Sequence, residues 1–298
     1  MLCAALVLSL LWCAPASAVV VVSSKLDSEA TTLSQMVRLM LDANGIATID
    51  RTRIGATPVV RRALLAGEID LYVEYTGNAG FFFNDSADPA WKSLDAGYAR
   101  AAKLDYEANH IVWLTPAHAS NAWALAVRRD VAQANGLKTM SDLARWVNGG
   151  GGIVLACSAE FANAGTLRSL EHTYGFVLKP AQMIVLAGGE TSATIGAAAA
   201  GTNGTNTAMV YSTDGGIVAA NLVLLEDDRH DQPIYAPTPV IREAVLKQNP
   251  RIADIVRPLM ESLTTEVLQR LNARVQIDGE SDQEVAEDYL KQKGFLRR

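Results

Sequence analysis

The chain is poor in cysteine and histidine, residue types on which many structural and catalytic sites depend. Of its 298 residues, three are cysteine and four are histidine. Cys3 and Cys13 lie within the first 18 residues, which leaves Cys157 as the single cysteine of the remaining chain. One cysteine cannot form an intramolecular disulfide, so the fold must be held by packed cores. Because Cys157 follows an apolar run, we interpret it as a small buried hydrophobe.

Patterns typical of metal sites and of nucleophilic catalysis are also missing. The four histidines are scattered without metal-ligand spacing, and the densest polar run, residues 226–231, alternates in sign as a solvated loop does. There is no G-x-S-x-G elbow, and no histidine stands near Cys157 in the sequence. The sequence therefore predicts no metal and no other cofactor, and it favours a protein that is not an enzyme.

Positive charge is in deficit, and long apolar runs are absent after the first 18 residues. The net charge of −6 does not favour the basic face that phosphate binding needs, so nucleic acid is not an expected partner. Residues 1–18 are uncharged, run apolar from Leu2 to Cys13 and end in Ala16-Ser17-Ala18, the small-residue pattern of a secretory signal. We expect export, with cleavage after Ala18.

Hydrophobic periodicity predicts alternating strands and helices in two units. Residues 19–22 form a β-branched run typical of a buried strand, and Ser28 is expected to cap a helix that ends at Asn44-Gly45. The middle of the chain repeats the alternation, which predicts a two-lobe α/β architecture. After Asp228 the pattern predicts helices only, over 240–247, 250–263 and 264–273, and a last helix opened by a capping box at residues 281–284. We expect this tail to cover the first lobe.

Residues 67–78, GEIDLYVEYTGN, join a strand pattern to a turn pattern. Alternating apolar and polar residues predict a short, half-buried strand. The turn that follows is expected to place Gly77 or Asn78 at positive φ. Because ligands bind at strand ends in α/β proteins, Tyr75 is a candidate site residue. Glu74 has no catalytic partner in the sequence, and we interpret it as structure at the turn or the lip of a cleft.

Aromatic residues make up only 6% of the chain, so their placement is informative. Tyr75, Trp123, Tyr211 and Tyr235 fall at strand ends or beside turns in both units, although each alone is more often packing than ligand contact. Aromatic faces attract a quaternary ammonium by ~0.5–2 kcal/mol each. Three or four faces supply ~2–6 kcal/mol, less than the ~8 kcal/mol of micromolar binding. Lobe closure and a polar anchor must supply the difference.

Seven short segments, taken in order along the chain, resemble those of one protein family. They are SSK (23–25), GEIDLYVEYTGN (67–78), NAWALAV (121–127), SAEF (158–161), LAGGETSATIGAAA (186–199), YSTDG (211–215) and PIYAP (233–237). In them the chain resembles the periplasmic substrate-binding proteins of ABC transporters for glycine betaine, choline and related osmoprotectants, above all the osmotically induced branch. The resemblance implies a type II periplasmic-binding-protein fold with the ligand in a cleft. We predict lobe 1 from residues 19–122 and 228–298, and lobe 2 from residues 123–227.

The resemblance also implies roles for particular residues and partners. Tyr75, Trp123, Tyr211 and Tyr235 match the aromatic box around the trimethylammonium group, with Trp123 where relatives often have tyrosine. Asn121 matches a polar position near the cation, and Lys25 and Asn78 match positions near the carboxylate of the ligand. The implied partners are a quaternary amine and the permease and ATPase subunits of an importer, and we expect a periplasmic monomer.

One departure concerns the carboxylate of the ligand. Relatives that bind glycine betaine commonly have an arginine a few residues after Glu160-Phe161, where this chain has Ala164, and the next arginine is Arg168. Loss of a charge-assisted hydrogen bond of ~1.5–3 kcal/mol weakens binding roughly 10- to 100-fold. We therefore predict weak binding of glycine betaine, or preference for another ligand with a cationic head. The alternatives are a sensor, a low-affinity binder of another cationic or zwitterionic molecule, or an enzyme that uses the same cleft.

Overall fold

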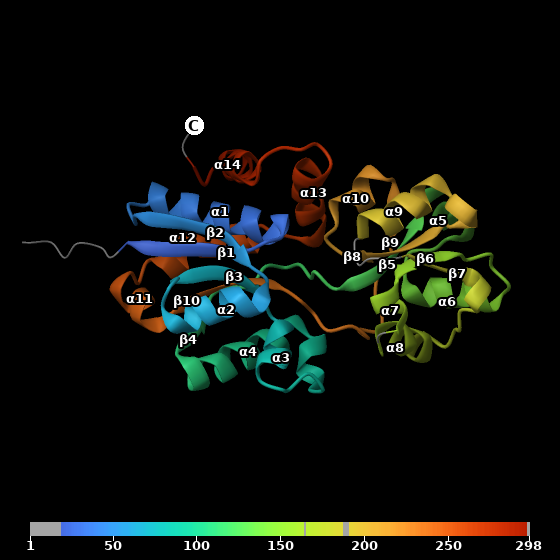
Figure 1. Cartoon of the computed structure of the whole chain (residues 1–298), viewed down its shortest axis with the longest axis horizontal. Coiled ribbons are helices and arrows are strands. Elements are labelled where there is room, and N and C mark those ends of the chain that lie inside the picture. Colours follow the sequence, from blue (N-terminus) through green and yellow to red (C-terminus); the bar gives the residue numbers. More distant parts are fainter. Residues whose placement is uncertain (1–18, 164, 187–190, 297–298) are drawn as a thin grey trace, which may run out of the picture.

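Two five-stranded sheets, each flanked by helices, divide the molecule into two lobes (Figure 1). The computed structural model describes residues 19–163, 165–186 and 191–296, so the predicted signal peptide lies outside the described residues. The chain passes between the lobes after strand β4 (Ile111–Trp113) and again before strand β10 (Pro237–Arg242). The predicted two-lobe α/β architecture is confirmed.

Lobe 1 contains the sheet with strand order β2-β1-β3-β10-β4, in which β10 runs antiparallel to both of its neighbours. Its elements before the first crossing are β1 (Val20–Lys25), α1 (Ser28–Ala43), β2 (Thr48–Gly55), α2 (Thr57–Ala66), β3 (Leu71–Tyr75), α3 (Asn78–Phe82), a 3₁₀ turn (Pro89–Lys92), α4 (Leu94–Asn109) and β4. After the second crossing come β10, α11 (Glu243–Gln248), α12 (Ile252–Glu261), α13 (Thr265–Gln276) and α14 (Asp282–Gln292).

Lobe 2 contains the sheet with strand order β7-β6-β8-β5-β9. Its elements are β5 (Trp123–Arg128), α5 (Arg129–Asn135), α6 (Met140–Asn148), β6 (Leu155–Ser158), α7 (Ala159–Asn163), α8 (Gly165–Tyr174), β7 (Met183–Leu186), α9 (Thr191–Ala200), β8 (Thr207–Tyr211), α10 (Gly215–Ala219) and β9 (Leu222–Leu224). Cys157 lies fully buried in the core of this lobe, as predicted. Burial raises the pKa of its thiol, which suits a packing role.

Strand β3 departs from the predicted half-buried pattern, since all five of its residues are buried. Leu71 and Val73 face a core shared with α1, α12 and α14, while Tyr72 faces a second core shared with α2 and α4. Helices cover both faces of the sheet, so the polar side chains of the alternating pattern point into protein rather than into water.

Strand β10 takes the first three residues of the helix predicted over 240–247, so that helix α11 begins only at Glu243. Pro237 and Pro239 lie in this strand between two neighbours, an unusual place for proline. Their carbonyl oxygens accept from the backbone of Ala117 and Leu114, on the side away from β3. The N–H groups that proline lacks would face the same side, so pairing with β3 does not need them.

The helical tail after β10 covers lobe 1, as expected, and also reaches lobe 2. Helices α12 and α14 pack against α1, and the predicted capping box at Ser281 and Glu284 opens α14. Helix α13 packs against α10 of lobe 2 and lies between the lobes in Figure 1. The approach is so close that a Cβ on Gly215 would lie 2.2 Å from the backbone nitrogen of Ala273. Within the described ranges, no helix combines the length and apolarity that crossing a membrane requires.

Candidate functional site

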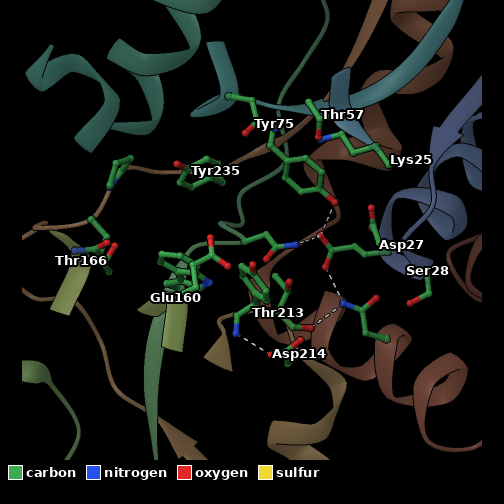
Figure 2. Close-up of a pocket in the computed structure, with 18 of the residues that line it drawn as sticks. Lys25, Asp27, Ser28, Thr57, Tyr75, Glu160, Thr166, Thr213, Asp214 and Tyr235 are labelled. Atoms are coloured by element: carbon green, nitrogen blue, oxygen red, sulfur yellow. Dashed lines mark hydrogen bonds between the residues drawn. The ribbon is translucent and has the colours of Figure 1, made fainter. Parts of the chain in front are cut away.

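A cavity of about 750 Å³ lies where the two lobes and the crossing segments meet. All seven residues predicted from the sequence line it: Lys25, Tyr75, Asn78, Asn121, Trp123, Tyr211 and Tyr235. Figure 2 shows Tyr75 and Tyr235 facing Thr213 and Asp214 across this space, with Glu160 at one side. The cavity therefore takes side chains from both lobes.

Four aromatic side chains reach the cavity from separate elements. Tyr75 ends β3, Trp123 begins β5, Tyr211 ends β8, and Tyr235 belongs to the second crossing segment. Trp123 and Tyr211 are paired in register across β5 and β8, and their ring centroids are 6.3 Å apart with the planes tilted by 31°. Phe161 meets Trp123 edge-on at 5.7 Å and supports it from the lobe 2 core.

Gly77 makes room for Tyr235, which corrects the expected turn geometry. Gly77 has φ −61° and precedes α3, and neither Gly77 nor Asn78 takes positive φ. A Cβ on Gly77 would lie 2.7 Å from the ring of Tyr235. This position requires glycine for close approach of an aromatic wall rather than for a left-handed turn.

Glu74 is fully buried and organises Lys25 and Asn78, so it has the predicted structural role at the turn but does not lie at the lip of the cleft. One of its carboxylate oxygens, Oε1, accepts from Lys25 Nζ, Asn78 Nδ2 and the Tyr75 backbone, and the other accepts from the Tyr72 hydroxyl at 2.8 Å. The Lys25 ammonium also lies 4.5 Å from the centroid of the Tyr75 ring. Lys25 and Asn78 line the cavity while their polar groups are already paired.

Glu29, in the first turn of α1, is the main cleft residue that the sequence did not reveal. It lines the cavity, is 4% exposed, and receives hydrogen bonds from Tyr75 Oη (2.8 Å), Asn121 Nδ2 (3.0 Å) and Asn272 Nδ2 (2.7 Å). Burial raises the pKa of its carboxyl, and donors from Thr213, Asn272 and Tyr75 oppose the rise. In the sequence Glu29 looks like an ordinary acidic residue at a helix start.

Asn272 joins the site to the contact between the lobes. Its Nδ2 donates to Glu29 Oε2 and to the carbonyl of Thr213, both at 2.7 Å. One turn away on α13, Gln269 donates to the carbonyl of Ser212 at 2.7 Å. Helix α13 thus links a cleft carboxylate of lobe 1 with the loop of lobe 2 that follows Tyr211.

Burial also acts on two tyrosines of the cavity, Tyr75 and Tyr235. It raises the pKa of Tyr75 well above its usual range, helped by the charge of Glu29, and it raises the pKa of Tyr235. Both rings therefore present neutral phenol groups. Two buried polar atoms of the crossing region, Asn121 Oδ1 and Trp123 Nε1, have no hydrogen-bond partner among the described residues.

The position aligned with the missing arginine, Ala164, lies outside the described residues. Arg168, the next arginine, is exposed on α8 and is not one of the residues that line the cavity. In the part of the chain that the structure describes, no three or more His, Cys, Asp or Glu side chains are grouped to hold a metal ion.

Comparison with known proteins identifies the family. The family model described as "Substrate binding domain of ABC-type glycine betaine transport system" matches residues 18–292. The chain belongs to this family. As a member of a family of solute-binding transport proteins, it has relatives with the same two-lobe architecture.

Two curated relatives and one solved structure illustrate the match. The glycine betaine-binding protein YehZ of Escherichia coli is 47% identical over 95% of this chain and 93% of its own length. A glycine-betaine-binding protein of Pseudomonas aeruginosa is 30% identical over 92% of this chain and 88% of its own length. The structure of apo YehZ from Escherichia coli has a TM-score of 0.89 and covers 93% of this chain and 99% of its own.

Proposed function

We propose that the protein binds a quaternary-ammonium solute between its lobes and delivers it to the permease of an ABC importer. In this proposal Tyr75, Trp123, Tyr211 and Tyr235 surround the ammonium group. The observation that supports it is the convergence of these four side chains, from both lobes and a crossing segment, on one cavity of about 750 Å³. That volume lies within the range of small-molecule sites.

Binding works by closure of one lobe on the other. Trp123 and Tyr211 belong to lobe 2, whereas Tyr75 belongs to lobe 1, so a ligand held by all three stabilises the closed state. Asn121 lies in the first crossing segment and donates to Glu29, which places a polar group of the hinge beside the cage.

Lys25 and Asn78 are the proposed neighbours of the polar end of the ligand. Both line the cavity, and Lys25 is held by Glu74. Without an arginine at position 164, a carboxylate at that end has a weaker anchor than in relatives that carry one. We therefore propose that glycine betaine is bound weakly relative to ligands with only a cationic head.

Export, the partner subunits and the oligomeric state complete the proposal. The apolar start of the chain and its Ala16-Ser17-Ala18 pattern support cleavage after Ala18 and a periplasmic location. The relatives are transport proteins, which supports a permease and an ATPase as partners. The proposed working form is a monomer without cofactor or metal.

Tyr211 is the best cage residue for a test, because it is 38% exposed and its loss disturbs little of the core. Calorimetric titration with choline should show at least about a tenfold loss of affinity in Tyr211→Ala, while Tyr211→Phe, which keeps the ring, stays within about threefold. Tyr106→Ala removes a tyrosine of similar exposure on α4, away from the cavity, and serves as the control. Unchanged affinity in Tyr211→Ala would contradict the cage.

A further inference from the structure

We propose that Glu29 makes the cleft selective for ligands with a net positive charge, so that it prefers a quaternary ammonium without a carboxylate to a zwitterion such as glycine betaine. This inference rests on the proposed function and narrows its ligand class. Glu29 acts as the buried anion of the site, fixed beside the cage wall Tyr75.

The carboxylate of Glu29 is buried without a cationic side chain to balance it. None of the ion pairs among the described residues includes Glu29, and its side-chain hydrogen-bond donors are all uncharged: the hydroxyls of Tyr75 and Thr213 and the amides of Asn121 and Asn272. Neutral donors fix the two oxygens in place but do not cancel the charge. A buried charge is costly unless an opposite charge compensates it, and a cationic ligand in the cavity supplies that charge.

The hydrogen bonds also hold the Glu29 carboxylate beside the proposed cage, where it attracts a bound cation. Oε1 accepts from the hydroxyl of Tyr75, whose ring is one of the proposed cage walls. Asn121, on the same oxygen, leaves its own Oδ1 without a donor in the described structure. A carboxylate and an amide oxygen therefore add negative potential beside the same aromatic side chain.

The rest of the described lining offers little to a ligand carboxylate. Lys25 is the single cationic side chain among the described lining residues, and Glu74 already pairs with it. The other charged lining residues besides Glu29 are Asp27, Glu160 and Asp214, all carboxylates. Glu29 attracts the ammonium group of a zwitterion, but the lining carboxylates repel its carboxylate. A simple cation is attracted without this repulsion.

Choline and glycine betaine are suitable probes, because they share the trimethylammonium group and differ in the charge of the other end. Calorimetric titration of both ligands is compared in the wild-type protein, Glu29→Gln, Glu29→Asp and the control Glu107→Gln. Glu107 is an exposed carboxylate on α4 that does not line the cavity. The control makes the same change of net charge outside the site.

We expect the wild-type protein to bind choline more tightly than glycine betaine. Glu29→Gln should lower the affinity ratio of choline to betaine about tenfold, because only the charge of residue 29 is lost while its size is kept. Glu29→Asp should weaken both ligands and keep the ratio within about threefold of wild type, and Glu107→Gln should leave both affinities unchanged within the same margin.

Three results would overturn the inference: tighter wild-type binding of betaine, equal losses for both ligands in Glu29→Gln, or a ratio in Glu29→Asp that falls as far as in Glu29→Gln. Equal losses would make Glu29 a purely structural support. If Glu29→Gln does not fold, the wild-type ratio and the Glu29→Asp ratio still decide the matter. Failure of the wild type to bind either ligand would instead refute the proposed function.

Discussion

At the scale of single residues, the sequence revealed the aromatic side chains of the cleft but not its buried carboxylates. Tyr75 and Tyr211 stand at recognisable strand ends, so their positions follow from local patterns. Glu29 is different, because its partners Tyr75, Asn121 and Asn272 are 46, 92 and 243 positions away. No local pattern reports such contacts, and an acidic residue in the first turn of a helix is ordinary.

The raised pKa of Glu29 predicts opposite effects of acid on folding and on binding. A carboxyl whose pKa is higher in the folded protein than in the unfolded chain favours the folded state at low pH, and this contribution is lost as pH rises through the folded pKa. Binding of a cation needs the ionised form. The stabilisation produced by choline should therefore shrink as the pH falls from 7.5 towards 5, because the raised pKa of Glu29 means that this carboxyl is protonated at a higher pH than an ordinary glutamate.

The measurement is the difference in melting temperature with and without choline across that pH range. Burial is the main cause of the rise, and Asp27, the N-cap of the same helix, adds to it. Tyr75 is the other titratable group in contact with Glu29, and its pKa lies far above the range tested. Glu29→Gln should remove the part of the pH dependence that is specific to choline. A choline effect with the same pH profile in both proteins would contradict the prediction.

At the scale of elements, the capping box of α14 was predictable, whereas the N-cap of α1 and the strand β10 were not. Asp27, rather than the expected Ser28, caps α1 by accepting from the backbone of Ala30. Residues 240–247 have a helical apolar pattern, and the two prolines that precede them argue against a strand inside a sheet, although Val240 and Ile241 are β-branched. Tertiary pairing with β3 and β4 decides the outcome, because β10 is the strand that joins β4 to the rest of the sheet. The contact between α13 and α10 could not be predicted from the sequence either, since it joins helices from different lobes.

Substitution of Gly215 by alanine should disrupt this contact between the lobes. The new Cβ would lie 2.2 Å from the backbone of Ala273, which cannot yield as a flexible side chain does, so α10 and α13 must separate. We expect a loss of ~1–3 kcal/mol in the free energy of unfolding, typical of overpacking. Ligand affinity should fall as well, because Asn272 then loses the carbonyl of Thr213.

Gly196→Ala is the matched control for chemical denaturation and calorimetric titration. Gly196 is exposed in the middle of α9, and nothing lies within 4 Å of an added Cβ. Alanine there should be neutral or stabilise by up to ~1 kcal/mol, because it favours the helix. Equal stability of the Gly215 variant and the control would show that the close approach of α10 and α13 is not maintained in solution.

At the scale of the whole molecule, the alternation of strands and helices was enough to predict two α/β lobes. The crossings between them follow from the same pattern, since each lobe needs a sheet of its own. The tail was harder to place: α12 and α14 belong with α1, while α13 serves both lobes. Hydrogen bonds from α13 to the carbonyls of Ser212 and Thr213 connect the two lobes, so the lobes are coupled in stability as well as in binding.

Ligand binding should therefore stabilise both lobes together and make the protein more compact. At a ligand concentration of about 100 times Kd, the stabilisation is ~2.7 kcal/mol, which for a domain of this class raises the melting temperature by roughly 5–10 °C. Scanning calorimetry should show one transition moving upward, and small-angle scattering should show a smaller radius of gyration with choline. At the same choline concentration Tyr211→Ala should show a smaller upward shift, because a tenfold loss of affinity leaves a stabilisation of ~1.4 kcal/mol. An upward shift confined to part of the unfolding transition would contradict coupled lobes.

The hydrogen bond between Glu29 and Asn272 joins residues 243 positions apart, and this has a consequence for the order in which the protein is assembled. Residue 29 emerges early from the ribosome or an export channel, while its partner emerges only after most of the chain. Throughout that interval the charged group of Glu29 lacks one of the donors that fix it. The core of lobe 1 is also incomplete during this interval, because it takes residues from β10, α12 and α14, and a finished binding site waits for α13. The protein therefore gains the ability to bind solute late in its synthesis. Chains truncated before α13 are expected to fold in part but not to bind.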